Sequence, residues 1–380
     1  MDIERRDEQR NAIEDIHLFL SNTKMDLQLL KSKFRGSMLG VLMGDCLGAP
    51  YENDELLSRG SKLVLQKSFN KLESPVTFKA PVMQFTDDSA MTRCVAESLI
   101  EKEDLDLIDL AKRFVKSYYQ EPFRGYGPGV VTVFQKLRGN KFKDVLLPAR
   151  EQFNGQGSWG NGGAMRVAPI ALFSYQNYEK LIDRTRRATE ITHTHKTGID
   201  GAILQAIAIQ QCLGLNPKDK LNVTNFIKEL IEKMDKIEED DEGLATSYSL
   251  DLVEPQPYKL KLEMLQELIT KDEDVLNSEE VIRLLGNSIA ALHSVPTAIF
   301  CFLRAQESIK DIETENPLRR AIQYAITLGG DTDTIGSMTG ALAGAFYGED
   351  NFNSNLMEHC EASKEFAHLG EKLLDAALKQ

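Results

Sequence analysis

A glycine-rich helix near the C-terminus restricts how this chain can fold. It lies in the segment LGGDTDTIGSMTGALAGA, which begins at Leu328. Its glycines recur every four residues, at Gly336, Gly340 and Gly344. The same helix carries the apolar residues Ile335, Met338, Leu342 and Phe346. Each glycine costs about 1 kcal/mol relative to alanine in a helix, so tertiary packing must hold this helix. Because small residues let a second helix approach closely, we expect it at the centre of the molecule.

Apolar residues recur with helical spacing along most of the chain, whereas strand signals are sparse. One apolar face comprises Met91, Val95 and Leu99, and another comprises Val281, Leu284, Leu285, Ser288 and Leu292. No repeat of fixed period is visible in the sequence, which argues against a helical solenoid. The sequence therefore predicts an all-α fold, a single compact orthogonal helical domain with a central cleft.

Residues that begin helices support this prediction. Asn277 with Glu280 resembles a capping box. Pro296 suits the first turn of a helix, and Asn316-Pro317 is typical of a cap followed by proline at the first helical position. These signals indicate helices in the C-terminal part of the chain.

The 380 residues are expected to form a short N-terminal extension and one large domain. Residues 1–30 form a charged leader, which we expect to be a peripheral N-terminal extension. Residues 31–380 are expected to form one domain that carries the chemistry. The acidic stretch from Glu238 to Pro257 interrupts the helical pattern, and we expect a surface loop there rather than a linker.

Composition excludes several classes of protein. The net charge of −13 argues against non-specific binding to the phosphate backbone of nucleic acids, so no direct DNA binding is expected. No apolar run approaches the roughly 20 residues of a membrane span. The five scattered cysteines are typical of reduced thiols inside the cell. The N-terminus lacks the apolar core of a secretion signal, which favours the cytoplasm or the nucleus.

Two adjacent carboxylates precede the helix that carries Met91. Asp87 and Asp88 follow Thr86 in the sequence FTDDS. The dipole and free amides of a helix N-terminus keep such carboxylates ionised. Helix capping is the commoner role of these residue types, so this motif alone does not indicate a metal.

A second acidic motif, GGDTDT, contains Asp331, Asp333 and Thr334. Its paired glycines permit a tight turn after which these oxygen groups can converge. Ligand sets made only of oxygen select magnesium, calcium or manganese over zinc. If the glycine-rich helix is central, its N-terminus is buried, and unpaired carboxylates there would be costly without cations. The two motifs together predict a hard-cation site, with capping as the alternative.

A glycine-rich loop covers residues 155–163. It can expose successive backbone amides and wrap a diphosphate, although a structural turn explains it equally well. Phe153 and Trp159 flank this loop, where an aromatic ring can stack on a base or pack in the core. His193 and His195 precede the next helix, and we expect capping or hydrogen bonding there, with His193 as a candidate ligand contact.

An early helix is expected to begin near Phe34 and to break at Gly48-Ala49-Pro50, which places Glu52 on a loop. Five motifs in this order resemble the ADP-ribosyl-acceptor hydrolase family: GDCLGAPYE, FTDDSAM, GNGGAMRVAP, ITHTH and LGGDTDTIGSMTGALAGA. Within the family, FNGQGSWGNGGAMR and GNSIAALHSVPTAIFCFLR are similar to members that hydrolyse serine-linked ADP-ribose and poly(ADP-ribose).

The resemblance implies roles for single residues. Two Mg²⁺ ions would be bound by Thr86, Asp87, Asp88, Asp331, Asp333 and Thr334. The catalytic residues would be Glu52, on a gating loop, and Asp331, with Asp88 as the alternative general base. The substrate would contact Phe153, Gln156, Gly157, Ser158, Trp159, Gly160, Asn161, Gly162, His193 and Ile289. One departure is Trp159, because similar proteins tend to have tyrosine there.

The implied enzyme is a magnesium-dependent glycosidase that hydrolyses the O-glycosidic bond at ribose C1″. It would remove ADP-ribose from serine on proteins and degrade poly(ADP-ribose), with O-acetyl-ADP-ribose as a further candidate substrate. ADP-ribosylated proteins and the polymer would be its partners in the DNA damage response. We expect a monomer in the nucleus and cytoplasm, with the mitochondrial matrix as an alternative.

Other functions fit parts of this pattern. A two-metal nucleotide phosphohydrolase would also use clustered aspartates and magnesium. An ADP-ribose-binding pseudoenzyme would keep the site without turnover. A purely structural helical protein is disfavoured, because it has no need for Asp-Asp and Asp-x-Asp beside glycine turns.

Overall fold

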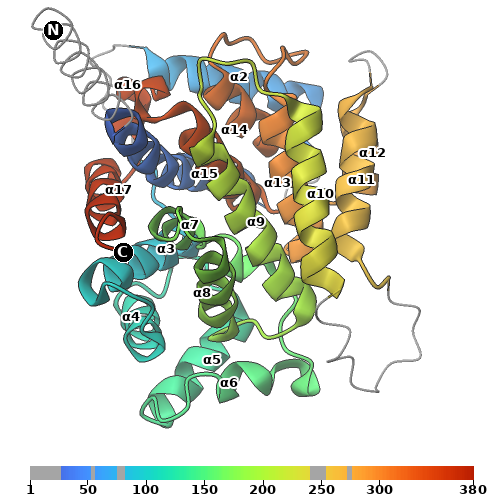
Figure 1. The fold of residues 1–380 in the computed structure, drawn as a ribbon. Helices are drawn as coiled ribbons and strands as arrows, with labels where there is room; N and C mark the ends of the chain where they lie inside the picture. Colours follow the sequence, from blue (N-terminus) through green and yellow to red (C-terminus); the bar gives the residue numbers. More distant parts are fainter. Residues whose placement is uncertain (1–26, 53–55, 75–81, 240–253, 272–275) are drawn as a thin grey trace, which may run out of the picture.

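The computed structural model describes residues 27–52, 56–74, 82–239, 254–271 and 276–380 (Figure 1). In these ranges the chain forms α-helices and short 3₁₀ helices, and its only strand-like pairings are three isolated β-bridges. The all-α prediction is confirmed. Residues 1–26 and 240–253, which hold most of the predicted extension and loop, lie outside the described residues.

The described part of the first helix covers residues 27–48, so this helix begins before Phe34 and ends at Gly48. The elements that follow are η1 (Ala49–Tyr51), α2 (Arg59–Glu73), α3 (Asp87–Lys102), α4 (Leu107–Gln120), α5 (Pro128–Gly139), α6 (Leu147–Arg150), η2 (Gln152–Gly155), η3 (Asn161–Gly163), α7 (Ala168–Phe173), α8 (Tyr178–Glu190), α9 (Lys196–Gly214), α10 (Val223–Glu239), α11 (Pro257–Ile269), α12 (Ser278–Leu284), α13 (Ala291–Arg304), α14 (Pro317–Thr327), α15 (Thr332–Tyr347), η5 (Glu349–Asn351), α16 (Ser354–Glu358) and α17 (Ser363–Ala377).

Helix α15 is the centre of the fold. All its residues from Thr332 to Phe346 are buried. It packs against α9, α13 and α14, and Figure 1 shows these helices arranged around it. The prediction of a central glycine-rich helix is therefore confirmed, and the acidic motif at its N-terminus is buried with it.

The glycines of α15 face glycines of the 27–48 helix. The opposed residues are Gly36 with Gly344, Gly40 with Gly340, and Gly44 with Gly336. A Cβ atom added to Gly40 would lie 1.9 Å from the carbonyl oxygen of Gly340, so the two backbones are in direct contact. This contact fixes the 27–48 helix against α15. The first of these helices ends shortly before Glu52, and the second begins at the acidic motif GGDTDT.

Two predictions about the helices near residue 290 are wrong. The apolar face expected from Val281 to Leu292 is split, because α12 ends at Leu284 and α13 begins at Ala291. Gly286 turns the chain between them with a φ of 96°. Pro296 lies inside α13 rather than in its first turn.

Other local predictions are confirmed. Asn277 caps α12 by accepting a hydrogen bond from the amide of Glu280 at 2.7 Å. Asn316 caps α14, whose first residue is Pro317. All five cysteines are free and buried. Within the described part of the chain, every helix is too short or too polar to span a membrane.

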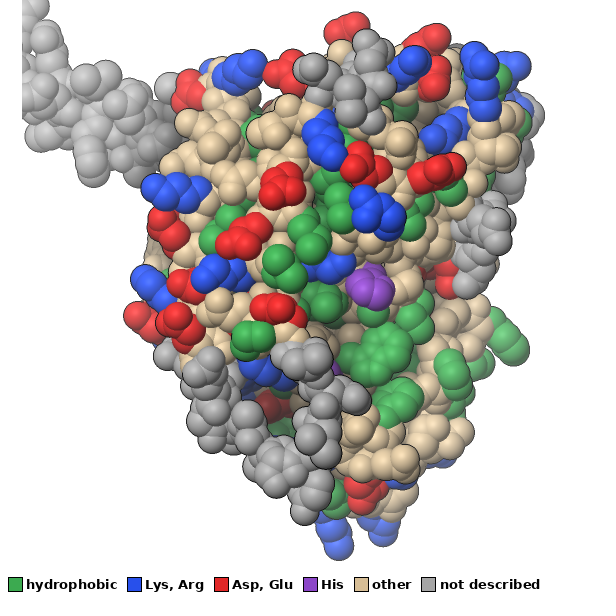
Figure 2. All heavy atoms as spheres, turned by 90° about the vertical axis from the view of Figure 1, so that its right-hand side faces the viewer, with side chains coloured by type: hydrophobic (Ala, Val, Ile, Leu, Met, Phe, Trp, Pro, Cys, Tyr) green, Lys and Arg blue, Asp and Glu red, His purple; other side chains and the backbone are tan. Residues whose placement is uncertain are grey.

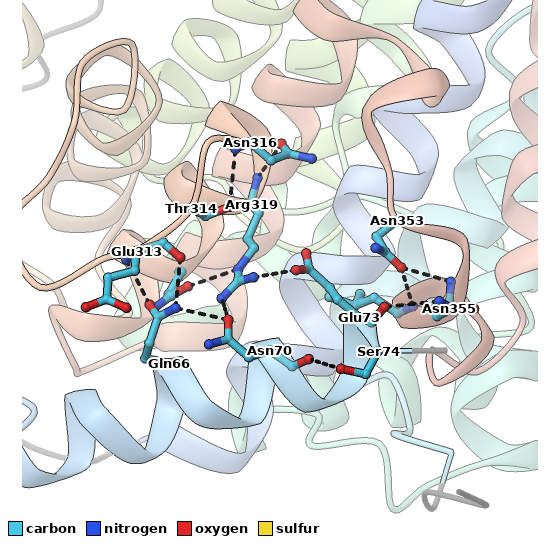
Figure 3. A network of polar contacts seen from close by, with 12 residues as sticks. Gln66, Asn70, Glu73, Ser74, Glu313, Thr314, Asn316, Arg319, Asn353 and Asn355 are labelled. Carbon is cyan, nitrogen blue, oxygen red and sulfur yellow. Dashed lines mark hydrogen bonds and ion pairs between the residues drawn. The ribbon is translucent and has the colours of Figure 1, made fainter. Parts of the chain in front are cut away.

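A partly buried polar network joins α2 to α14 (Figure 3). The Arg319 guanidinium pairs with Glu73 and donates to Oδ1 of Asn70 at 2.6 Å. The same guanidinium lies 5.2 Å from the centre of the Phe69 ring. This network holds α2, the first α-helix after Glu52, against the central helices.

Candidate active site

The amides at the N-terminus of α3 are capped by groups other than the Asp87 and Asp88 carboxylates. The Thr86 hydroxyl accepts from the amide of Asp88 at 3.3 Å. The buried carboxylate of Asp45 accepts from the amides of Thr86 and Ser89, each at 3.0 Å. Capping, the alternative role for the acidic pair, is thus performed by Thr86 and Asp45. The carboxylates of Asp87 and Asp88 remain available for another role.

The remaining amide in this first turn, that of Asp87, donates to the carbonyl of Arg124 at 2.6 Å. Arg124 forms a two-pronged ion pair with Glu361, at 2.6 and 3.0 Å. Its guanidinium lies 3.9 Å from the centre of the Phe85 ring, a cation–π contact. These contacts clamp the loop before α5 against the start of α3.

The two acidic motifs meet at the N-termini of α3 and α15. Thr86 and Thr334 each donate a hydroxyl hydrogen bond to Oδ2 of Asp88, at 3.2 Å in both cases. Thr334 and Asp88 are 246 residues apart in the sequence. Asp333 lies beside them, where its Oδ1 accepts from the amide of Thr334 at 2.8 Å.

Glu52 completes the acidic cluster from the end of the first helix. It is exposed, whereas Asp331 and Asp333 are buried, and ligand atoms of the three carboxylates all lie within 4.8 Å of one another. Thr332 donates to the carbonyl of Gly48 at 2.9 Å, which fixes the start of α15 against the helix end before Glu52. The predicted placement of Glu52 just after the helix break is confirmed.

The charges of this cluster suit divalent cations. Burial, followed by repulsion from neighbouring carboxylates, raises the pKa of Asp87 to about 8. The same causes raise the pKa values of Asp88 and Asp333 well above their usual range, and burial raises that of Asp331. Oδ1 of Asp88 is buried without a hydrogen-bond partner. Oxygen donors, a partnerless buried oxygen and carboxylates that repel one another fit hard cations such as Mg²⁺.

The glycine-rich loop is joined to this cluster through Asn161. Its buried amide donates to Oδ2 of Asp331 at 2.5 Å and to the Ser294 hydroxyl at 3.1 Å. The backbone of Asn161 donates to the carbonyl of Ile289 at 2.9 Å, and Ala291 donates to that of Trp159 at 3.1 Å. The loop and the start of α13 therefore lie side by side next to Asp331.

Exposed apolar side chains lie on the loop and on the segment before α13. Phe153, Trp159 and Ile289 are 54%, 44% and 60% exposed. Figure 2 shows one face of the molecule, where hydrophobic side chains gather beside a surface histidine and a hollow. Phe153 has a left-handed φ of 50°, which turns the chain just before the glycine run. The loop thus presents flat apolar surface to solvent next to a polar cluster.

The other predicted substrate contacts lie along the loop. Gln156 is exposed, and the Ser158 hydroxyl accepts from the amide of Gly160 at 3.3 Å. Gly157 is buried, and a Cβ added there would lie 2.2 Å from Oγ1 of Thr194. Residue 157 must therefore be glycine for the loop to rest on the segment before α9.

His193 is buried beneath the loop. A Cβ added to Gly162 would lie 2.6 Å from its ring, and its Nδ1 is 2.7 Å from the Thr192 hydroxyl. Burial and the charge of Arg166 lower the pKa of His193 to about 3. Arg166 in turn donates to the carbonyl of Gly162 at 2.6 Å and to the Thr192 hydroxyl at 2.9 Å. His195 caps α9 as predicted.

Several residues that shape the site were not predicted. Asp45 has a signal in the sequence, because a carboxylate among the apolar residues of a glycine-faced helix needs buried partners. Arg166 lies three residues after the glycine-rich loop, but nothing in that spacing indicates that its side chain turns back to Gly162. Arg124 and Glu361 are 237 residues apart, and only the folded chain brings them together.

Comparison with known proteins agrees with the geometry. Residues 26–380 match the ADP-ribosylglycohydrolase family. The chain is similar to ADP-ribosylhydrolase ARH3 of Mus musculus, with 43% identity over 90% of this chain and 91% of the relative. It is also similar to ADP-ribosylhydrolase ARH3 of Homo sapiens, with 42% identity over 90% of this chain and 93% of that protein.

A solved structure shares the fold. It is described as an ADP-ribosylglycohydrolase-related protein complex, and it aligns with a TM-score of 0.59 and 20% identity over 92% of this chain and 99% of that chain. The family resemblance inferred from the five sequence motifs is therefore confirmed. The chain belongs to the ADP-ribosylglycohydrolase family.

Proposed function

We propose that this chain, an ADP-ribosylhydrolase by family, uses magnesium to cleave the O-glycosidic bond at ribose C1″. The substrates would be serine-linked ADP-ribose on proteins and poly(ADP-ribose), with O-acetyl-ADP-ribose as a further substrate. The observation that carries this proposal is the meeting of the two acidic motifs, where Thr334 donates to Asp88 at 3.2 Å. The names of the mouse and human relatives support the class of reaction.

Two magnesium ions would be held by Thr86, Asp87, Asp88, Asp331, Asp333 and Thr334. The partnerless Oδ1 of Asp88 and the raised pKa values of the cluster support a cation at this place. When bound, the cations would supply the positive charge that keeps these carboxylates ionised and would polarise oxygen atoms of the ribose.

The protein's own carboxylates would move the protons. In hydrolysis through an oxocarbenium-like transition state, one group accepts a proton from water and another assists the leaving oxygen. Asp331 is our candidate for the base because Asn161 holds its carboxylate from the loop side at 2.5 Å, and Asp88 is the alternative. Glu52, which is exposed at the edge of the cluster, would hold the leaving group or protonate its oxygen.

The loop from Gln156 to Gly162 would surround the ribose and diphosphate with backbone amides. Phe153, Trp159 and Ile289 would offer apolar surface to the adenine, which their exposure supports. His193 would support the loop from beneath rather than titrate, because its pKa is about 3.

Hydrolysis of a serine-ADP-ribosylated peptide tests this function. We expect Mg²⁺-dependent release of intact ADP-ribose, and loss of that release in the Asp87→Asn/Asp88→Asn variant with its helical content retained. Asp375→Asn, on the exposed surface of α17, should keep full activity. Release of AMP or phosphate would indicate a nucleotide phosphohydrolase, and binding without turnover a pseudoenzyme. Either result would contradict the proposal.

We further propose that residues 31–380 form one catalytic domain with residues 1–30 as its extension, which the family match over 26–380 supports. The partners would be ADP-ribosylated proteins and the polymer, without direct DNA binding, and the chain would act as a monomer. We propose the nucleus and cytoplasm as its compartments, with the mitochondrial matrix as the alternative. Imaging of the tagged chain tests the compartments.

A further inference from the structure

Asp45 lies at the back of the proposed cation site on the 27–48 helix. Its side chain is fully buried. Its carboxylate accepts from the amide of Thr86 at 3.0 and 3.1 Å, and from the amide of Ser89 at 3.0 Å. Asp45 therefore holds the residues on both sides of Asp87 and Asp88.

The helix that carries Asp45 is itself fixed. Gly44, the preceding residue, is in contact with α15, since a Cβ there would lie 2.0 Å from the carbonyl oxygen of Gly336. The helix of Asp45 is thus held against α15 at Gly44, and Asp45 itself reaches α3 through its carboxylate. It links the two helices whose N-termini supply the acidic motifs.

The carboxylate of Asp45 also lies beside the cluster. The two amides that donate to it belong to Thr86 and Ser89, the residues that flank Asp87 and Asp88. Capping two amides needs only an oxygen acceptor, which serine or asparagine supplies at a smaller desolvation cost. A negative charge at this buried place would be stabilised by cations held next to it.

We propose that Asp45 is a positioning residue of the cation site: it orients Asp87 and Asp88 through two backbone amides and strengthens cation binding through its charge. This inference rests on the proposed cation site. Outer residues that orient metal ligands typically change metal affinity by about 10- to 100-fold when replaced. A purely structural cap would change stability and leave cation affinity unaltered.

Calorimetric titration of the full-length protein with Mg²⁺, in the absence of substrate, tests the proposal. We expect Asp45→Asn to weaken Mg²⁺ binding by about 10-fold or more. Raising Mg²⁺ should restore much of the hydrolytic activity, because Asp87 and Asp88 are still present. The matched control is Asp200→Asn, which changes another buried aspartate, on α9, and should leave Mg²⁺ affinity unchanged.

The outcomes separate the two proposals. If the natural protein binds no Mg²⁺ or Mn²⁺, the proposed cation site is wrong and this inference falls with it. If the natural protein binds Mg²⁺ and Asp45→Asn binds it equally well, only the role of Asp45 is wrong. Should Asp45→Asn not fold, Asp45→Ser, which is smaller and keeps an acceptor, takes its place. Failure of both variants to fold with Mg²⁺ present would overturn the proposal in favour of a structural cap.

Discussion

Asn161 donates a hydrogen bond from Nδ2 to Oδ2 of Asp331 at 2.5 Å and thereby joins the glycine-rich loop to the acidic cluster. Both side chains are buried, with 7% and 6% of their surfaces exposed, so little water competes for this bond. The part of the site proposed for diphosphate and the part proposed for catalysis are therefore held in one arrangement.

Asn161→Ala should lower kcat/KM for a serine-ADP-ribosylated peptide by about 10- to 100-fold, because hydrogen bonds to charged groups contribute about 1.5–3 kcal/mol. Steady-state kinetics measure this loss. Asn225→Ala, which removes an exposed asparagine of α10, serves as the control and should be without effect. Full activity of Asn161→Ala would show that the loop and the acidic cluster work independently.

Gly340→Ala should destabilise the protein by about 1–3 kcal/mol or more, because its Cβ would lie 2.0 Å from the carbonyl oxygen of Gly40. Urea unfolding measures the change. Gly139→Ala provides the comparison: it ends α5, nothing lies within 4 Å of its added Cβ, and the expected change is within about 1 kcal/mol. Equal effects of the two substitutions would contradict the close contact of the two helices.

The sequence predicted the central helix and the two acidic motifs because each depends on local patterns of a few residues. Glycine spacing in α15 signalled a close helix contact, and the same spacing at Gly36, Gly40 and Gly44 identifies its partner once both are compared. The break at Gly286 was missed because apolar residues on both sides of it happen to continue one helical face. Pairing with the glycine loop, rather than local preference, sets the start of α13.

Residues that act across long sequence distances could not be predicted in this way. The salt bridge from Arg124 to Glu361 depends on how helices pack, and no local pattern encodes it. For Asp45, the sequence indicates a carboxylate that needs buried partners, but only the packing shows that these partners are amides of α3. The placement of His193 beneath the loop also depends on how distant segments pack together.

Burial of His193 makes stability depend on pH. Its pKa falls from an ordinary 6.5 to about 3, so below pH 6.5 the unfolded chain binds a proton that the folded chain does not. Stability contributed by this residue is therefore lost as the pH falls from 6.5 towards 3. The His193→Asn variant has no titrating group at this position. Relative to that variant, the natural protein should lose about 2 kcal/mol of its free energy of unfolding between pH 7.5 and 5. Parallel urea-unfolding profiles of the two proteins over this range would contradict the burial of a neutral histidine.

Trp159→Ala should raise KM by about 5- to 150-fold with little change in kcat, because stacking on a base contributes about 1–3 kcal/mol. Trp159→Tyr should stay close to the natural protein. Leu63→Ala removes an apolar side chain of similar exposure from α2 and should not affect KM. A fall in kcat without a rise in KM would place Trp159 in the chemistry instead of in substrate binding.

The motifs around Asp88 and Asp333 are expected to form one two-metal site. Anomalous diffraction from crystals soaked in Mn²⁺ tests it most directly, because Mn²⁺ takes the same oxygen ligands as Mg²⁺ and can be located individually. Two anomalous peaks between residues 86–88 and 331–334 are predicted. No peak there, in crystals of protein that hydrolyses serine-linked ADP-ribose with Mn²⁺, would contradict the account.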